Sequence, residues 1–160
     1  MFKNIKMKNI DKIYNENQKK IGEEVGISVW LKITQKLIDS FADTTFDHQF
    51  IHTDLERATQ DTHFGSTISH GFLVLSLSTR FKTEAIPDFS GEKMKINYGF
   101  NKVRFTNPVK CNDEIRGHFL LQELSKRSEN ELLFNYKLTT EIKGKKKPAL
   151  VCDWLSLSIF

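Results

Sequence analysis

Cysteine and proline are scarce in this 160-residue sequence, which has two cysteines and three prolines. No apolar run reaches the roughly 18–20 residues that a membrane-spanning helix needs, and residues 1–20 contain neither a continuous apolar stretch nor a small-residue cleavage site. Cys111 and Cys152 lie far apart without metal-type spacing, which is typical of apolar fillers in a reducing compartment. These absences predict a cytoplasmic protein that does not cross a membrane.

An excess of charge of one sign is lacking too, because 24 Lys and Arg residues stand against 20 Asp and Glu residues. The basic run 143–147 is interpreted as a solvated turn. Nucleic-acid binding calls for a longer basic stripe with interleaved aromatic residues, so nucleic acid is not an expected partner. The length fits one domain over residues 1–160, in which residues 1–20 form a polar N-terminal extension that packs weakly or adds one short helix.

The first half of the chain predicts one strand followed by helices. Residues 28–33 are typical of a strand, and Thr34 is a suitable N-cap for a helix that runs to about Ala42. Residues 69–81 carry apolar side chains on nearly all sides of a helical wheel, which indicates a wholly buried helix, and Ser69 is expected to cap it.

The second half alternates apolar and polar residues as antiparallel strands do. Four strands are predicted, over residues 96–105, 115–121, 132–142 and 150–159. The phase of the alternation changes between Phe100 and Val103, which predicts a β-bulge. One early strand, one buried helix and four antiparallel strands favour an α+β arrangement, the hot-dog fold, in which a long antiparallel sheet wraps around a central buried helix.

The segment 43–69 has no regular periodicity, apart from a possible short helix over residues 55–59. Long irregular segments in small domains are usually functional or disordered, and the aromatic residues in this one argue against disorder. Asp47 and His52 lie five residues apart among apolar neighbours, so desolvation and mutual influence can move their pKa values toward working pH. Adding water to an activated double bond, or removing it, needs two such proton-handling groups. Spacing alone leaves open that Asp47 caps a turn and His52 is a satisfied core histidine.

The residues around this pair resemble a known signature. Phe41-Ala42-x-Thr44-Thr45-x-Asp47-x-Gln49-x-Ile51-His52-x-Asp54-x-Glu56-Arg57-Ala58 is similar to the hydratase signature of MaoC-like dehydratases and R-specific enoyl-CoA hydratases, above all in the branch that includes nodulation protein N. Further matches are Ile68-x-His70-Gly71-Phe72-Leu73, Asn97-Tyr98-Gly99 and Val103-Arg104-Phe105. Together the matches span about residues 28 to 157, in order and at family-like spacing.

The resemblance implies a hot-dog homodimer that acts on acyl thioesters of coenzyme A or acyl carrier protein, without a cofactor or a metal. The implied reaction is that of a lyase, which hydrates a trans-2-enoyl thioester to a 3-hydroxyacyl thioester or catalyses the reverse dehydration. Asp47 and His52 would hold the reacting water, and the backbone N–H of Gly71 would polarise the thioester carbonyl, a role that suits the unpaired N–H groups of a helix N-terminus. The substrate-binding candidates are Gln49, Phe50, Ser69, His70, Phe72 and Arg104.

Two departures from the family pattern bear on the site. Phe46 stands where the family usually has glycine, so a positive φ at that position would strain the backbone or change the loop. Gln49 and Phe50 replace the Asn-Pro pair that is common in the better-known hydratases. Two other functions stay open, an acyl-CoA thioesterase and a module that binds acyl thioesters without turning them over.

Other polar residues leave alternatives open. Four histidines fall between residues 48 and 70 near two aspartates, but their spacing matches no metal-ligand motif. Ser76 and Thr79 either hydrogen-bond the catalytic pair or bond the carbonyl four residues earlier. Lys102 and Arg104 either meet the phosphates of coenzyme A or face solvent.

Overall fold

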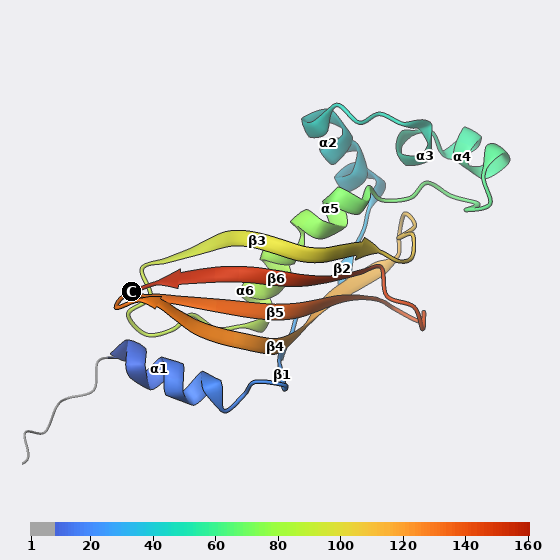
Figure 1. Cartoon of the computed structure of the whole chain (residues 1–160). Helices are drawn as coiled ribbons and strands as arrows, with labels where there is room; N and C mark the ends of the chain where they lie inside the picture. Colours follow the sequence, from blue (N-terminus) through green and yellow to red (C-terminus); the bar gives the residue numbers. More distant parts are fainter. Residues whose placement is uncertain (1–8) are drawn as a thin grey trace, which may run out of the picture.

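A curved antiparallel sheet of six strands is the frame of the molecule in the computed structural model, which describes residues 9–160 (Figure 1). The strand order is β1-β4-β5-β6-β3, and β2 also pairs with β4. The strands are β1 (Glu24–Ile27), β2 (Leu31–Lys32), β3 (Met94–Phe105), β4 (Glu114–Ser128), β5 (Glu131–Ile142) and β6 (Leu150–Ile159).

The four predicted antiparallel strands are confirmed, because alternate residues of β4, β5 and β6 are buried along most of each strand. Strand β4 runs seven residues beyond the predicted end at Leu121, as far as Ser128. The predicted bulge is confirmed between Asn101 and Arg104, and β3 has a second register shift between Asn97 and Gly99.

The predicted early strand over residues 28–33 is wrong in its extent, since Ser28, Val29 and Trp30 separate β1 from β2. The reason is a local exchange of hydrogen-bond partners. The hydroxyl oxygen of Ser28 accepts the backbone N–H of Gly117 at 2.9 Å, a proton that a regular ladder would give to a carbonyl oxygen. The chain therefore follows β4 without forming one continuous strand.

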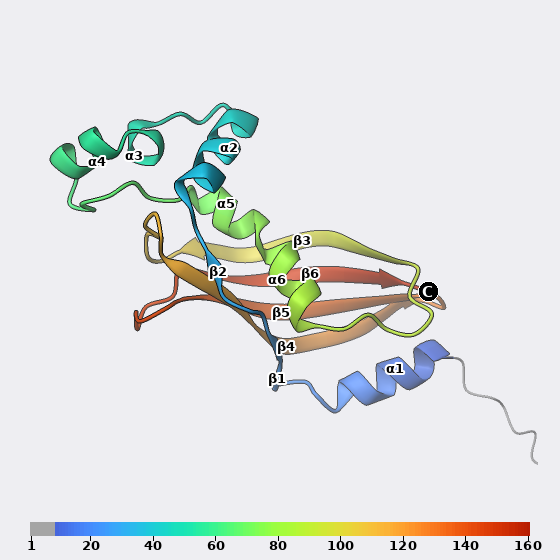
Figure 2. The ribbon, with the colours of Figure 1, turned by 180° about the vertical axis from the view of Figure 1, so that it is seen from behind.

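Two short helices, α5 (Gly71–Ser76) and α6 (Ser78–Ala85), cover one face of the sheet, as the opposite views in Figures 1 and 2 show. The prediction of one wholly buried helix over residues 69–81 is therefore wrong. The helix divides at Leu77, and only the side toward the sheet is buried, through Leu73, Val74 and Phe81, whereas Phe72 is 67% exposed in the single chain. The expected cap is also wrong, because the N-cap residue is His70 rather than Ser69.

Three further helices, α2 (Gln35–Thr45), α3 (Phe50–Thr53) and α4 (Leu55–Asp61), gather beyond one end of the sheet (Figure 2). The predicted cap of the first is confirmed, since the Thr34 hydroxyl accepts the backbone N–H of Leu37. The predicted short helix over residues 55–59 is confirmed as α4. These helices bring the irregular segment over the start of α5.

The N-terminal extension contributes one helix, α1 (Asn9–Gln18), and residues 1–8 lie outside the described part of the chain. Ile10 and Ile13 are both buried in the hydrophobic core, so this helix packs firmly rather than weakly. Within residues 9–160, no helix combines the length and the apolar character needed to cross a membrane.

Candidate active site

The loop that carries Asp47 begins where α2 ends. Phe46 caps the helix in the left-handed conformation, with φ of 58° and ψ of 24°, and its N–H donates to the Ala42 carbonyl. The position does require a positive φ, and a phenylalanine here costs about 1–2 kcal/mol more than glycine. Its side chain is 87% exposed, so packing offsets little of this cost. The N–H of Asp47 also donates to Ala42, at 3.2 Å, which fixes the start of the loop.

His52 is buried on α3, and its ring orientation is defined by one hydrogen bond. Nδ1 lies 2.7 Å from the carbonyl oxygen of Ile68. Because a carbonyl only accepts, Nδ1 carries the proton and a neutral ring keeps its lone pair on Nε2. Burial is the main cause that lowers the pKa of His52, the nearby His70 lowers it further, and the Ile68 bond and Asp47 act in the opposite direction. The ring is therefore suited to accept a proton near neutral pH.

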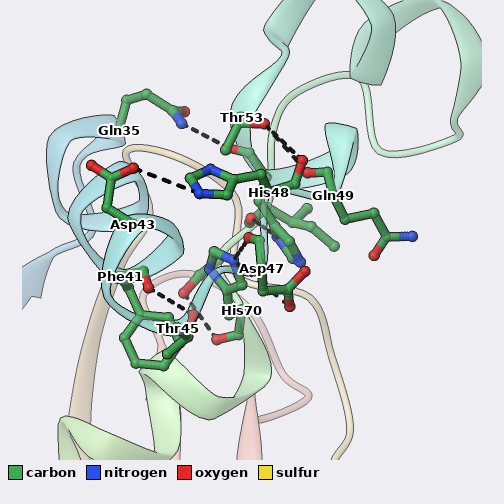
Figure 3. A network of polar contacts seen from close by, with 12 residues as sticks. Gln35, Phe41, Asp43, Thr45, Asp47, His48, Gln49, Thr53 and His70 are labelled. Atoms are coloured by element: carbon green, nitrogen blue, oxygen red, sulfur yellow. Dashed lines mark hydrogen bonds and ion pairs between the residues drawn. The ribbon is translucent and has the colours of Figure 1, made fainter.

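His70 lies against Asp47 and His52, at the N-cap of α5. Its ring stacks on that of His52, with centroids 3.7 Å apart and an interplanar angle of 25°. Its Nε2 donates to the backbone carbonyl of Asp47 at 2.9 Å, a contact visible in Figure 3. The same nitrogen is 4.0 Å from a carboxylate oxygen of Asp47.

Asp47, His52 and His70 thus form one cluster, in which one possible ligand atom from each residue lies within 4.8 Å of the others. One nitrogen of each histidine hydrogen-bonds a backbone carbonyl, and the two rings stack with their centroids 3.7 Å apart. The other two histidines of the segment lie outside the cluster: His48 is 3.8 Å from Asp43, and His63 packs on Phe64. That the protein binds no metal stays a prediction.

A cavity of about 300 Å³ opens beside the cluster, large enough for a short acyl group. His52, Ser69 and Gly71 contribute polar groups to its wall, and the rest of the lining is Phe64, Ile68, Val74, Phe105, Thr106, Asn107, Pro108, Val109 and Ala149. As the first residue of α5, Gly71 has an N–H with no acceptor within the helix. A Cβ at this position would lie 3.0 Å from the Phe105 ring, so glycine keeps the approach to that N–H open.

The remaining substrate-binding candidates lie outside this cavity in the single chain. The Gln49 carbonyl accepts the His52 N–H at the start of α3, and the Phe50 ring lies under the Arg57 guanidinium at 4.0 Å. The exposed ring of Phe72 packs edge-on against Phe105, and Arg104 is exposed and donates to the neighbouring Val103 carbonyl. The structure brings Asp47, His52, Ser69, His70 and Gly71 together.

The hydroxyls of Ser76 and Thr79 do not hydrogen-bond Asp47 or His52. Ser76 donates to the carbonyl of Phe72, four residues earlier in the helix, which was one of the two expected partners. Thr79 accepts from the side chain of Asn97 at 3.2 Å.

Gln35, which no sequence pattern indicates, connects the elements of the site. Its amide donates to the His52 carbonyl at 2.7 Å and to Asp39 at 2.8 Å, and its oxygen accepts from Thr67 at 2.6 Å. This residue therefore holds α2, α3 and the segment before α5 together. A partner 17 residues away in the chain leaves no local pattern that could have revealed it.

Comparisons with known proteins identify the family of the chain. Residues 16–142 match the family described as MaoC like domain. Nodulation protein N of Rhizobium leguminosarum bv. viciae is 43% identical over 141 residues, which cover 88% of each chain. The 3-hydroxyacyl-thioester dehydratase Z of Mycobacterium tuberculosis is 41% identical over 132 residues, covering 82% of this chain and 86% of that one.

Solved structures show the same fold. A monoamine oxidase regulatory protein from Archaeoglobus superposes with a TM-score of 0.71 at 28% identity, covering 87% of this chain and 90% of that one. The (R)-hydratase from A. caviae superposes with a TM-score of 0.65 at 22% identity, covering 83% of this chain and 95% of that one. The sheet, the two helices on its face and the relatives that share them place this chain in the MaoC-like dehydratase family, with a hot-dog fold.

Proposed function

We propose that the protein is a hydratase of acyl thioesters, which adds water across the double bond of a trans-2-enoyl thioester to give a 3-hydroxyacyl thioester and catalyses the reverse dehydration. The observation that carries the proposal is the position of His52: it adjoins Asp47 and lines the cavity that also contains Gly71, the first residue of α5. A proton acceptor and a carbonyl-polarising donor thus share one small cavity. The dehydratase activity in the name of the Mycobacterium tuberculosis relative agrees with this reaction.

The residues divide the reaction between them. A ring nitrogen of His52 and a carboxylate oxygen of Asp47 are at most 4.8 Å apart, a span that one water molecule can bridge. The neutral imidazole takes a proton from this water while the water oxygen bonds to C3 of the enoyl group. Negative charge then develops on the thioester oxygen, where the Gly71 N–H and the positive end of α5 stabilise it. Return of the proton to C2 completes the addition.

We also propose that the active unit is a homodimer. Strand β3 is at the end of the strand order and carries exposed apolar residues, among them Ile96, Tyr98 and Phe105, and Phe72 is exposed nearby on α5. An edge strand with apolar side chains is a suitable surface for pairing with a second copy. Sedimentation equilibrium should give twice the mass of the chain, and a monomer at micromolar concentration would contradict the dimer.

The experiment follows the loss of enoyl absorbance when purified protein meets a trans-2-enoyl-CoA. The wild type is expected to remove the absorbance, and Asp47→Asn or His52→Ala to lose most of the activity while circular dichroism shows an intact fold. Asp43→Asn and His48→Gln are matched controls, because these residues belong to the same segment and their exposed side chains pair with each other outside the cluster of Asp47, His52 and His70. Both controls should keep the wild-type rate.

Two outcomes would favour other functions. Release of free thiol from a saturated acyl-CoA would indicate a thioesterase. Binding of an enoyl-CoA in a calorimeter, with no change in absorbance, would indicate a non-catalytic binding module. Full activity in both Asp47→Asn and His52→Ala would contradict the proposed site.

A further inference from the structure

His70 is buried where three parts of the site meet, and only 3% of it is exposed. One side of its ring packs on His52 of α3, and Phe41 of α2 packs on it at 5.1 Å between ring centroids. Its Nε2 donates to the backbone carbonyl of Asp47, and Figure 3 shows the ring of His70 between Phe41 and Asp47. Although it is the N-cap residue of α5, its side chain makes no capping hydrogen bond. Its contacts therefore serve the site rather than the helix.

Asp47 depends on this histidine for its position. Two hydrogen bonds hold its backbone. Its N–H donates to the Ala42 carbonyl at 3.2 Å, and its carbonyl accepts from Nε2 of His70 at 2.9 Å. Within residues 9–160, no group donates a hydrogen bond to its carboxylate, which is 55% exposed. The backbone from which the carboxylate extends is thus held at two points, and His70 supplies one of them.

We propose that His70 is a positioning residue of the hydratase site, which fixes the Asp47 loop through Nε2 and keeps the His52 ring in place by stacking. The inference rests on the proposed function. His70 is not among the residues that line the cavity, so it acts through Asp47 and His52 rather than by touching substrate.

The same contact influences the protonation of His52. Among residues 9–160, the titratable groups that act on the His52 ring are Asp47, from the loop after α2, and His70, from the segment before α5. His70 lowers the pKa of His52 and Asp47 raises it. Removing the His70 imidazole should therefore raise the pKa of His52, and the pH below which the base becomes protonated and inactive should move upward.

Two substitutions separate the two contacts. His70→Gln can still donate a hydrogen bond to the Asp47 carbonyl but lacks the titratable ring. His70→Phe keeps a ring between Phe41 and His52 but cannot hydrogen-bond Asp47. We expect His70→Phe to lower kcat by about 10- to 100-fold, because small displacements of a reacting group have effects of this size, while KM changes little. His70→Gln should restore most of that loss, yet shift the acidic limb of the pH profile to higher pH.

The control is His48→Gln, which removes an exposed histidine of the same segment and should alter neither kcat nor the profile. The titration of the His52 ring is also followed by NMR, which needs no activity and therefore still tests His70 if the wild type proves not to be a hydratase. A higher His52 pKa in both variants, with loss of kcat in His70→Phe, supports the proposal. It is overturned if the His52 pKa is unchanged in both, or if both variants lose only thermal stability while kcat per folded molecule stays at the wild-type value.

Discussion

A lysine in the hydrophobic core makes the stability of this protein depend on pH in a predictable direction. Lys82 of α6 is only 7% exposed, and its ammonium group donates to the Ser156 hydroxyl between the rings of Tyr136 and Trp154. Burial is the main cause that lowers its pKa from 10.5 to about 8, with a smaller contribution from Lys95. Because the charged form is disfavoured inside the fold, this residue opposes folding wherever it is protonated.

The size of the effect follows from the two pKa values. A fall from 10.5 to about 8, at about 1.36 kcal/mol per unit, corresponds to about 3 kcal/mol of lost stability. Below about pH 8 both the folded and the unfolded chain hold the proton, so the cost is complete and constant. Between about pH 8 and 10.5 only the unfolded chain holds it, so stability rises with pH across this window.

The test compares Lys82→Met with the wild type by urea unfolding. At pH 7 the variant should be more stable by about 2 kcal/mol, since removal of the buried charge outweighs the roughly 1 kcal/mol lost when Ser156 is left without its donor. At pH 9.5 the difference in unfolding free energy between the variant and the wild type should be smaller by about 2 kcal/mol, because Lys82 of the folded wild type is mostly neutral at that pH. Lys36→Met, at an exposed position of α2, is the control and should show no change with pH. An equal difference in unfolding free energy between Lys82→Met and the wild type at both pH values would refute the reasoning.

Three further predictions concern the site. The pKa of His52 is lowered from 6.5, so kcat/KM should stay high down to pH 6.5 and fall only below it; a midpoint above 6.5 in the pH–rate profile would contradict a buried, neutral base. Gly71→Ala should lower the hydration rate by about 10- to 100-fold, because its Cβ meets the Phe105 ring at 3.0 Å; a wild-type rate in this variant would contradict a close approach of the substrate to Gly71. Phe46→Gly should raise the melting temperature by about 2–4 °C, because glycine relieves about 1 kcal/mol of strain at φ of 58°; an unchanged or lower value would show that the exposed ring contributes to stability.

The sheet was predictable from the sequence because alternation reports burial directly. Strand β6 was placed over residues 150–159, where it begins and ends in the structure, and the change of phase after Phe100 located a real bulge. The extent of the early strand was not predictable from the sequence. Its path depends on a hydrogen bond from the backbone N–H of Gly117 to the Ser28 hydroxyl, and Gly117 lies 89 residues further along the chain. Hydrogen bonds between distant residues leave no periodicity to read.

Helix burial was overestimated for a related reason. The apolar residues of the segment 69–81 surround the wheel, but one chain supplies only one sheet face to cover them, and Phe72 stays exposed. At the candidate site, too, local sequence predicted some features, whereas others depend on contacts between distant residues. Spacing and resemblance indicated Asp47, His52 and Gly71. In the fold His52 and Gly71 line one cavity and Asp47 adjoins His52, but the contacts through Gln35 and the stacked ring of His70 arise only in three dimensions.

The central claim is that Asp47 and His52 act on the same water as one unit. It is tested most directly by the initial rate of trans-2-butenoyl-CoA hydration for Asp47→Asn, His52→Ala and the variant that carries both changes. Groups that work as a unit are non-additive, so the double variant should be no slower than the slower single variant, to within about threefold. Losses that multiply, so that the double variant falls by the product of the two single effects, would contradict a shared water and with it the mechanism.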